Sequence, residues 1–600
     1  MIFSTFFHSL IITVIIGYSY LFKIFFKIKD DDIYNLDLLY GIFFLFFLSL
    51  VLNFLFPLKF FSLIIIFIGF IFFIYCFYKK KIKVNLLFYA LIIFVYIFII
   101  FTHGDNIDSP MYHHQIIKWL YNYKISLGLT NLEIRFGDNS LWFSFLSLLQ
   151  FKLKNFNSIF TLNIIPFVLL SYEILKPKKS ISYLFLNLSL SFIFFFSYLH
   201  PYKNGIILNH LHNPEVDTVA MIFFIMSCYL FLIFLDKKNK DIFYLMTISS
   251  LLCILIKISY LGVILFPLSA LILFYRKNIS EILKTKLNII ILLVFLLWLC
   301  KNFLISGCLI FPLSVTCFNV NWSPGIEEID TYSKVVKGFA RDTRERLRYL
   351  DFEHTIYSYN WILPWLKDYA LNTALLKISL TIVFLSTSLF FLKKKFSNLI
   401  NIDSEKKNDH LIVIFVLLIN LLFWFQAPEI RFGWGTIISL NCYLISILFF
   451  YNVFFKKINL KLIKYSTLFV LSLLIFDNIN NLNFKNLMSP YTRNFNYSKI
   501  VKIYDLNKVI IYQSKDRQCY DFPGICVNSP KDKYFLDEKL GYLIFKNKKQ
   551  IKIIIDFHDN EQFKKNRFSI LPFGFFTNSF CNWSFNSRVD NKYINYFFYL

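Results

Sequence analysis

The chain of 600 residues is poor in glycine, proline and acidic side chains. It holds 16 glycines and 15 prolines, and 37 Asp and Glu residues stand against 63 Lys and Arg. Charged residues make up 17% of the chain, whereas soluble globular proteins carry about 25%. This low charge excludes an ordinary soluble domain. The sequence also lacks a nucleotide-binding Gly-rich loop, so an ATP-driven protein has no support.

Hydrophobic residues make up 57% of the chain and gather in long runs. A bilayer is crossed by a helix of about 20 apolar residues. The sequence therefore predicts an all-α polytopic membrane protein with about fourteen transmembrane helices, at residues 2–22, 38–56, 60–78, 86–100, 158–175, 181–199, 219–235, 242–256, 259–274, 287–305, 374–392, 411–425, 436–455 and 465–476.

The basic residues indicate the orientation of these spans. If the spans alternate in direction, the seven Lys- and Arg-rich clusters between them all fall on one side. Cytoplasmic loops carry such clusters, because basic residues resist translocation. The net charge of +26 is therefore mainly a topology signal, and we expect no nucleic-acid partner, which would need a basic soluble face. The loops predicted to lie outside are 103–157, 200–218, 306–373 and 426–435.

The segment 477–600 follows the last span and has a soluble character. We expect it to form a small mixed α/β domain outside the membrane, with strand-like runs at 508–512 and 551–557.

Two close cysteine pairs occur in segments predicted to be external. Because close pairs outside the reducing cytosol favour disulfides, we expect bonds within the pairs Cys308/Cys317 and Cys519/Cys526. A zinc site is the alternative, but it needs four ligands, and no C-x-x-C pair or histidine partner accompanies these cysteines. Cys581 is left over.

Two carboxylates lie where the first long external loop begins. Ser109 and Pro110 are typical of a helix start, and an amphipathic helix with an aromatic face follows. Asp105 and Asp108 lie between the preceding span and this helix. A carboxylate at the membrane surface is suited to removing a proton from a hydroxyl group. The alternative is that Asp108 only helps to start the helix and that Asp105 is solvated.

Several motifs in a fixed order resemble a known superfamily. They are DSPMYHHQIIKW, GLTNLEIRFGDNSLWF, NPEVD at 213–217, KNFLISGCLIFP at 301–312, APEIRFGWG at 427–435 and CYDFPGIC at 519–526. This arrangement resembles the GT-C superfamily of membrane glycosyltransferases and, more narrowly, a bacterial branch of polytopic membrane proteins. The resemblance implies a GT-C-like core at 86–476, an accessory transmembrane module at 1–85 and a location in the bacterial inner membrane.

The resemblance also implies roles for particular residues. Asp108 takes the position of the acidic residue ahead of Tyr-His and is the first choice for the catalytic base, with Asp105 as second choice. We expect the substrate to be bound by Tyr112, His113, Lys118, Asn131, Arg135 and Asp217. Glu133 stands where the branch usually has histidine, so this position has no assigned role.

Two basic residues near predicted external helix ends are candidates for binding the phosphate of a lipid-linked donor. Lys257 interrupts the apolar stretch LLCILIKISYLG, and a lysine there usually faces a cavity, a phosphate or the interface. Its alternative is a side chain that only extends to the membrane surface. Arg431 lies in APEIRF, and its alternative is a surface ion pair with Glu429.

A metal site is a weaker interpretation of HLHNPEVD. His210, His212, Glu215 and Asp217 are ligand types, but their spacing is generic, and we prefer a polar loop that faces the substrate. We therefore expect no metal and no cofactor.

Together these features predict a glycosyltransferase that moves a sugar from a polyprenyl-phosphate donor to a glycan or lipid acceptor outside the membrane. Its partners are the lipid bilayer, this donor and the acceptor. The alternatives are a transporter or flippase of lipid-linked glycans and a non-catalytic membrane scaffold. A transporter usually has charged residues in broken helices near the membrane midplane, whereas here they concentrate in the external loops.

Overall fold

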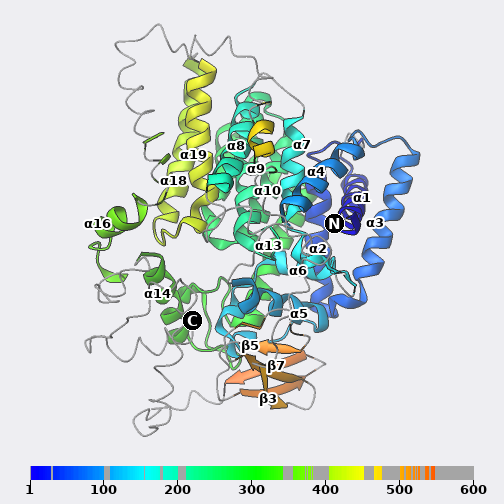
Figure 1. Ribbon diagram of the computed structural model, residues 1–600, viewed down its shortest axis with the longest axis vertical. Helices are drawn as coiled ribbons and strands as arrows, with labels where there is room; N and C mark the ends of the chain where they lie inside the picture. Colours follow the sequence, from blue (N-terminus) through cyan, green and yellow to red (C-terminus); the bar gives the residue numbers. More distant parts are fainter. Residues whose placement is uncertain are drawn as a thin grey trace. The chain divides into compact units, whose positions relative to one another are not determined.

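The computed structural model of the chain is mostly helical (Figure 1). It describes residues 2–28, 32–100, 108–153, 156–175, 180–199, 211–341, 356–371, 404–451 and most of 500–547, with isolated residues within 373–382 and 465–475.

Among the described residues, five helices are long and apolar enough to cross a membrane. They are α1 (Ile2–Phe26), α2 (Leu38–Leu55), α9 (Val216–Lys237), α13 (Lys286–Ser306) and α19 (Ile430–Tyr451). Five shorter apolar helices accompany them: α3 (Ser62–Tyr78), α4 (Leu86–Ile100), α7 (Ile164–Ile174), α8 (Ile181–Leu199) and α18 (Ser404–Trp424). The apolar helices suit a membrane protein, but the described part of the chain contains five long spans, or six if a bent pair of helices is one span, rather than fourteen.

The smaller number has identifiable causes. The run 158–175 begins with a 3-10 turn, so that its helix α7 has only 11 residues. The run 259–274 is divided into η7 (Ile258–Ile264) and α11 (Leu265–Phe274), and α11 turns by 92° into the segment Arg276–Leu283. The runs 374–392 and 465–476 lie largely outside the described residues. Apolar composition alone does not determine where a helix ends.

The chain forms two compact units. The first comprises Met1–Ile125, Asn139–Lys301 and Ala374–Asn528, and the second comprises Ser126–Asp138, Asn302–Thr373 and Ser529–Leu600. Helices α1 to α3 belong to the first unit together with α4 to α10. The proposed boundary at residue 85 therefore stays a prediction.

Two glycine contacts let α1 pack closely against its neighbours. A side chain at Gly17 would collide with the backbone carbonyl of Gly69 on α3, and one at Gly41 on α2 would collide with the carbonyl of Ile15. The backbone N–H of Gly41 also donates to Ser19 Oγ at 3.1 Å. Small residues at such points are typical of helices that pack within a membrane.

The helix α9 forms the centre of the first unit. It is buried along almost its whole length and packs against α7, α8, α19 and α10 (Lys240–Ile256), as Figure 1 shows. An all-round apolar helix of this kind is buried by its neighbours on every side. Its N-terminus carries the polar residues described below.

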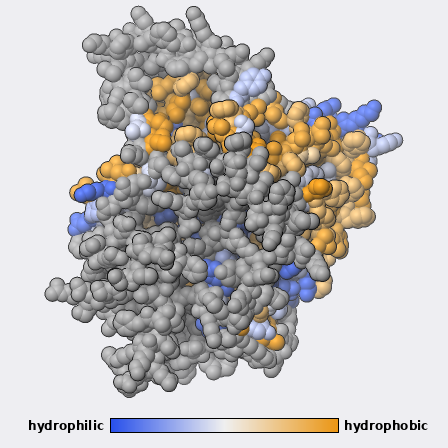
Figure 2. Space-filling view, viewed as in Figure 1, coloured by the Kyte–Doolittle hydropathy of each residue, from blue (hydrophilic) through white to orange (hydrophobic). Residues whose placement is uncertain are grey.

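An apolar face remains uncovered on α3. Leu63, Phe67, Ile71 and Ile74 recur at helical spacing along it and are exposed. Figure 2 shows hydrophobic side chains gathered on this face of the molecule. Such a surface would be costly in water and suits contact with lipid.

The described strands near the C-terminus are divided between the two units. In the first unit, β3 (Ile500–Asp505) pairs antiparallel with β4 (Ile510–Ser514), and β4 pairs parallel with β5 (Ile525–Val527). In the second unit, β6 (Tyr534–Lys539) and β7 (Tyr542–Asn547) form an antiparallel pair. The expected strand at 508–512 corresponds to β4, and the one at 551–557 lies outside the described residues.

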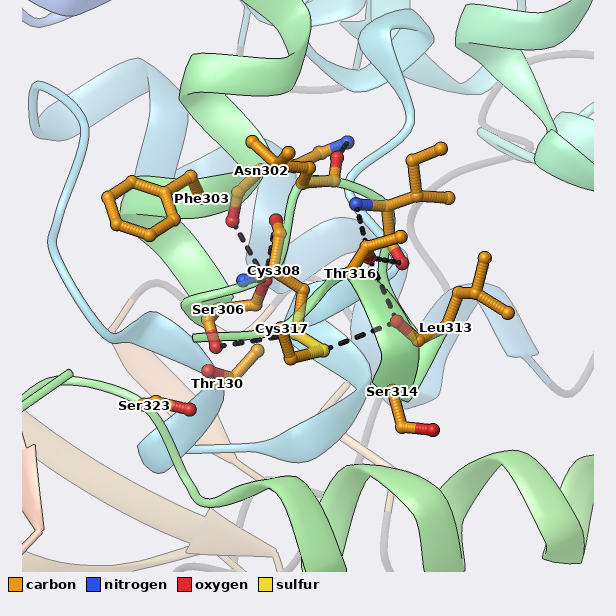
Figure 3. Close-up of a disulfide and its surroundings, with 12 residues drawn as sticks. Thr130, Asn302, Phe303, Ser306, Cys308, Leu313, Ser314, Thr316, Cys317 and Ser323 are labelled. Atoms are coloured by element: carbon orange, nitrogen blue, oxygen red, sulfur yellow. Dashed lines mark hydrogen bonds between the residues drawn. A yellow bond between two sulfur atoms is a disulfide. The ribbon is translucent and has the colours of Figure 1, made fainter. Parts of the chain in front are cut away.

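Both expected cysteine pairs are bonded. Cys308–Cys317 closes the loop that follows α13 (Figure 3), and Cys519–Cys526 closes the loop that leads into β5. In the second unit, Cys308 packs in a small core with residues of α14 (Ile326–Arg341). Cys581 lies outside the described residues.

Candidate functional site

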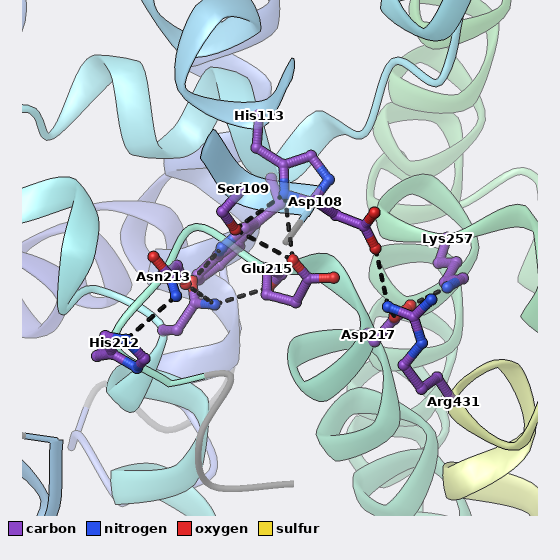
Figure 4. A network of polar contacts seen from close by, with 11 residues as sticks. Asp108, Ser109, His113, His212, Asn213, Glu215, Asp217, Lys257 and Arg431 are labelled. Carbon is purple, nitrogen blue, oxygen red and sulfur yellow. Dashed lines mark hydrogen bonds and ion pairs between the residues drawn. The ribbon is translucent and has the colours of Figure 1, made fainter. Parts of the chain in front are cut away.

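Four charged side chains meet in the first unit at helix ends that are far apart in the sequence. Asp108 directly precedes the short π-helix η2 (Ser109–His113), and Asp217 lies in the first turn of α9. Lys257 is the residue after α10, and Arg431 lies in the first turn of α19. Figure 4 shows the Asp108 carboxylate pointing toward Arg431.

Arg431 takes part in three ion pairs. Its Nη1 lies 2.8 Å from Asp108 Oδ2 and 3.9 Å from Asp217 Oδ2. Its Nε lies 3.6 Å from Glu429 Oε1. The local pair with Glu429 therefore exists, but the shorter contact is with Asp108, whose position in the sequence is 323 residues away.

Asp217 holds the two cations beside each other. Its Oδ1 pairs with the ammonium of Lys257, while its Oδ2 faces Arg431. The Lys257 ammonium also lies 4.0 Å from the centroid of the Phe432 ring, which is a cation–π contact. Lys257 is therefore directed toward the other charged groups of the site.

A second group of polar side chains adjoins Asp108. Nδ1 of His113 lies 3.2 Å from Oε2 of Glu215 and 3.2 Å from Oγ of Ser109, and the Ser109 hydroxyl donates to Glu215 at 3.2 Å. All three side chains are buried. In a hydrolase triad the serine and the acid contact opposite nitrogens of the imidazole. Here both contact Nδ1, so the group does not have the geometry of a nucleophilic triad.

The ends of the apolar helices α9 and α10 suit the charges that they carry. An acidic residue is stabilised at a helix N-terminus and a basic one at a C-terminus, which is where Asp217 and Lys257 lie. Arg431 lies at the N-terminus of α19, where the helix dipole disfavours a cation. Its position is compensated by the surrounding carboxylates.

Carboxylates outnumber cations at the site, which we call the ion-pair cluster. Its described members are the acids Asp108, Glu215, Asp217 and Glu429, the cations Lys257 and Arg431, and His113. With four acids against two cations, the cluster has a negative net charge even when His113 is protonated.

The pKa of the Asp108 carboxyl reflects these competing charges. Burial is the largest single effect and raises this pKa, but the charge and the hydrogen bond of Arg431 together with the charge of His113 lower it by more, so that it lies below its usual value. The charge of Glu215 opposes this lowering. Asp108 is thus ionised at neutral pH.

The alternative role of Asp108, to start a helix, does not use its side chain. Asp108 occupies the N-cap position of η2, but its carboxylate makes no capping hydrogen bond there. The carboxylate instead pairs with Arg431. Asp105, the second candidate, lies outside the described residues.

The disulfide loop at 519–526 holds the helix that follows η2. The Lys118 ammonium, on α5 (His114–Asn122), donates to the backbone carbonyl of Phe522, and Gln115 Oε1 accepts from the Cys526 N–H at 3.0 Å. The Cys519 N–H donates to the carbonyl of Pro110 at 2.9 Å. The described contacts of Lys118 thus tie two parts of the chain together, and its expected role in substrate binding stays a prediction.

The other expected substrate residues lie in different places. Tyr112 contacts the His113 ring, with centroids 4.3 Å apart, beside the cluster. Asn131 and Arg135 belong to the second unit. There Asn131 Nδ2 donates to the carbonyls of Trp322 at 2.7 Å and Phe545 at 2.9 Å, and Arg135 lies in a 3-10 turn.

A metal centre finds no support in the described residues. No three of their His, Cys, Asp and Glu side chains are arranged to hold a metal ion. His210 lies outside the described residues, and His212 Nε2 contacts the Asn213 amide at 3.2 Å.

Residues 1–438 match the family described as domain of unknown function (DUF8201). This match covers more than half of the chain. The chain belongs to this family. No curated protein and no solved structure matches the chain. The DUF8201 match includes all members of the ion-pair cluster.

Two residues of this DUF8201 protein were not expected from the sequence to take part in the ion network. Glu215 was considered only as a weak metal ligand or as part of a polar loop, and Ser109 only as the start of a helix. The available signal was that Glu215 lies two residues before Asp217, at the start of an apolar span. Two acids at such a position require burial or compensation, and both are buried here.

Proposed function

We propose that the protein is a GT-C-like glycosyltransferase in the bacterial inner membrane. It moves a sugar from a polyprenyl-phosphate donor to a glycan or lipid acceptor on the extracytoplasmic side. The observation that carries the proposal is the ion pair of Asp108 with Arg431, next to Lys257, at the ends of apolar helices.

The cluster contains the two kinds of group that this reaction needs. A carboxylate that is ionised at neutral pH is suited to accept a proton from a sugar or lipid hydroxyl. Guanidinium and ammonium groups bind phosphate through charge-assisted hydrogen bonds, and they stabilise the charge that develops on a leaving phosphate. Asp108 supplies the first function, and Arg431 and Lys257 supply the second.

The proposed step is a single displacement. Asp108 takes the proton of the acceptor hydroxyl, and the oxygen of that hydroxyl forms a bond to the anomeric carbon of the donor sugar. The bond from this carbon to the phosphate oxygen breaks, and its electron pair stays on the phosphate, which leaves as polyprenyl phosphate bound to Arg431 and Lys257. Attack opposite the leaving group inverts the configuration of the sugar.

The test is the Asp108→Asn variant of the full-length protein in lipid nanodiscs. With a panel of polyprenyl-phosphate sugars, the release of polyprenyl phosphate should fall by about 10²- to 10⁴-fold, because the base is lost. The matched control is Asp330→Asn, which removes a carboxylate from an exposed ion pair with Lys334 on α14. An Asp108→Asn protein that is folded and still transfers sugar would contradict the proposal.

The sharp bend between α11 and Arg276–Leu283 favours a second candidate, a flippase of lipid-linked glycans. Broken helices are typical of transporters. The bend is separated from Lys257 by η7 and α11, so it does not adjoin the cluster along the chain. A flippase needs no proton acceptor. Lipid movement that persists in Asp108→Asn, without any sugar transfer by the wild-type protein, would favour this candidate.

A further inference from the structure

The charge of the ion-pair cluster is unsuited to an anionic ligand as it stands. Its four carboxylates already exceed its two cations. A phosphate group adds more negative charge at a site that is partly removed from water, where repulsion between like charges is strong. For a phosphate to bind there, one carboxylate has to leave its cation or become neutral.

Asp108 is the carboxylate best placed to leave. Asp217 is buried, with a side chain 3% exposed, and it faces both cations. The Asp108 side chain is 29% exposed. Among the described residues, its ion pair is with Arg431 alone. Separating Asp108 from Arg431 therefore breaks one contact, whereas moving Asp217 would separate it from two cations.

Arg431 can receive a phosphate at the same atoms. Its described ion pairs use Nε and Nη1, and the contact with Asp108 is made through Nη1. A guanidinium binds phosphate best through two parallel N–H donors. Bidentate binding through both terminal nitrogens thus uses Nη1, the atom that contacts Asp108.

We propose that the phosphate of the donor takes Arg431 away from Asp108, so that the base is released only when the donor is bound. This inference rests on the proposed function and adds the regulation of its site. Without donor, the carboxylate is held in an ion pair. With donor, it loses the neighbouring cation and gains a neighbouring anion, and both changes strengthen its affinity for a proton. The donor therefore binds before the acceptor is activated.

The test measures binding of a long-chain polyprenyl monophosphate to the full-length protein in nanodiscs, with inorganic phosphate as a second arm. Asp108→Asn should bind the lipid phosphate about fivefold more tightly than wild type, because the competing carboxylate is gone, and this gain corresponds to about 1 kcal/mol. Arg431→Gln should bind it at least about tenfold more weakly. In an Arg431→Gln background, Asp108→Asn should bring no gain.

Glu215→Gln is the matched control, because it removes one negative charge from the cluster without breaking the contact with Arg431. Equal gains from Asp108→Asn and Glu215→Gln would overturn the exchange and indicate general repulsion. Weaker lipid-phosphate binding in Arg431→Gln without tighter binding in Asp108→Asn would also overturn the exchange, but it would leave the phosphate site of the proposed function in place. No lipid-phosphate binding by any of the proteins would overturn both. If Asp108→Asn binds both the lipid phosphate and inorganic phosphate more tightly, or the lipid phosphate alone, the exchange is supported. If it binds neither more tightly, the exchange is contradicted.

Discussion

The Glu173 carboxylate and the acids of the ion-pair cluster, all in the first unit, have contrasting surroundings. On α7, the buried Glu173 carboxylate accepts hydrogen bonds from the Asn35 amide at 2.6 Å and from the Tyr229 hydroxyl at 3.3 Å. Asn35 in turn donates to the Leu169 carbonyl and accepts from the Tyr89 hydroxyl. The partners of Glu173 are therefore neutral. The acids of the ion-pair cluster instead share two cations.

Neutral partners suit a structural role, whereas a shared cation suits an acid whose partner can be replaced by a ligand. A buried polar group whose donors and acceptors are satisfied by neutral partners fixes one arrangement of the chain. An acid that shares a cation with other acids, and that keeps some exposure, can give up this partner to a ligand. The Glu173 network has the first character, and Asp108 has the second.

The largest effect that would sharpen this comparison concerns Lys257. Lys257→Met keeps the length of the side chain and removes its charge, so it should lower kcat/KM for the polyprenyl-phosphate donor by about 10²-fold, within the range for a buried charge pair. Glu173→Gln should change the same constant by less than about threefold. A Lys257→Met protein with wild-type kcat/KM would indicate that Lys257 only pairs with Asp217 and does not bind the donor.

The free energy of unfolding, unlike kcat/KM, should respond to a change at Glu173. Glu173→Leu leaves the Tyr229 hydroxyl and one donor contact of Asn35 without an acceptor, so we expect the free energy of unfolding to fall by about 2 kcal/mol. Binding of polyprenyl phosphate by the folded fraction should not change. Unfolding in mixed micelles measures the first quantity and lipid titration the second. A variant of unchanged stability that has lost lipid binding would place Glu173 in the site.

Five members of the ion-pair cluster were predicted from the sequence as site residues, three as the base or the phosphate ligands and two, His113 and Asp217, as substrate residues. Asp108, Lys257 and Arg431 each lie near the end of an apolar run, where a charged residue of either sign is conspicuous. Asp217 was predicted as a substrate residue, and its link to both cations became visible only in the structure. Linear spacing does not show which helix ends meet.

The same limit applies to the Glu173 network and to the spans. Asn35 and Glu173 are 138 residues apart, and no periodic pattern connects them. The helical character of the chain followed from its apolar runs, but the length of each helix did not. Local turns such as η7 shorten helices within runs that are apolar throughout.

A smaller effect is expected in the pH dependence of kcat/KM, which reports the pKa of Asp108. In the protein without donor, burial raises the pKa of Asp108, but the charge and hydrogen bond of Arg431, together with His113, bring it below its usual value. Asp108 is then ionised down to a pH below that value, and the stability from its ion pair is lost only as the pH falls through the lowered pKa. The acid limb of kcat/KM should therefore lie below about pH 4 in wild type. In Arg431→Gln, burial and Glu215 still raise the pKa, so the limb should move up by about one pH unit or more. A limb that stays in place would remove Asp108 as the titrating group.

The smallest effect concerns the disulfide loop beside the cluster. Cys519 and Cys526 donate backbone N–H groups to Pro110 and Gln115, which lie on either side of His113 in the sequence. Replacing both cysteines by serine should loosen this support and lower the transfer rate by about twofold to threefold, because small displacements of a base slow proton transfer. The matched control replaces Cys308 and Cys317 by serine in the second unit. If the two double variants slow transfer equally, the loop supports the fold in general, and its contacts with the η2 and α5 segment have no specific role in placing Asp108.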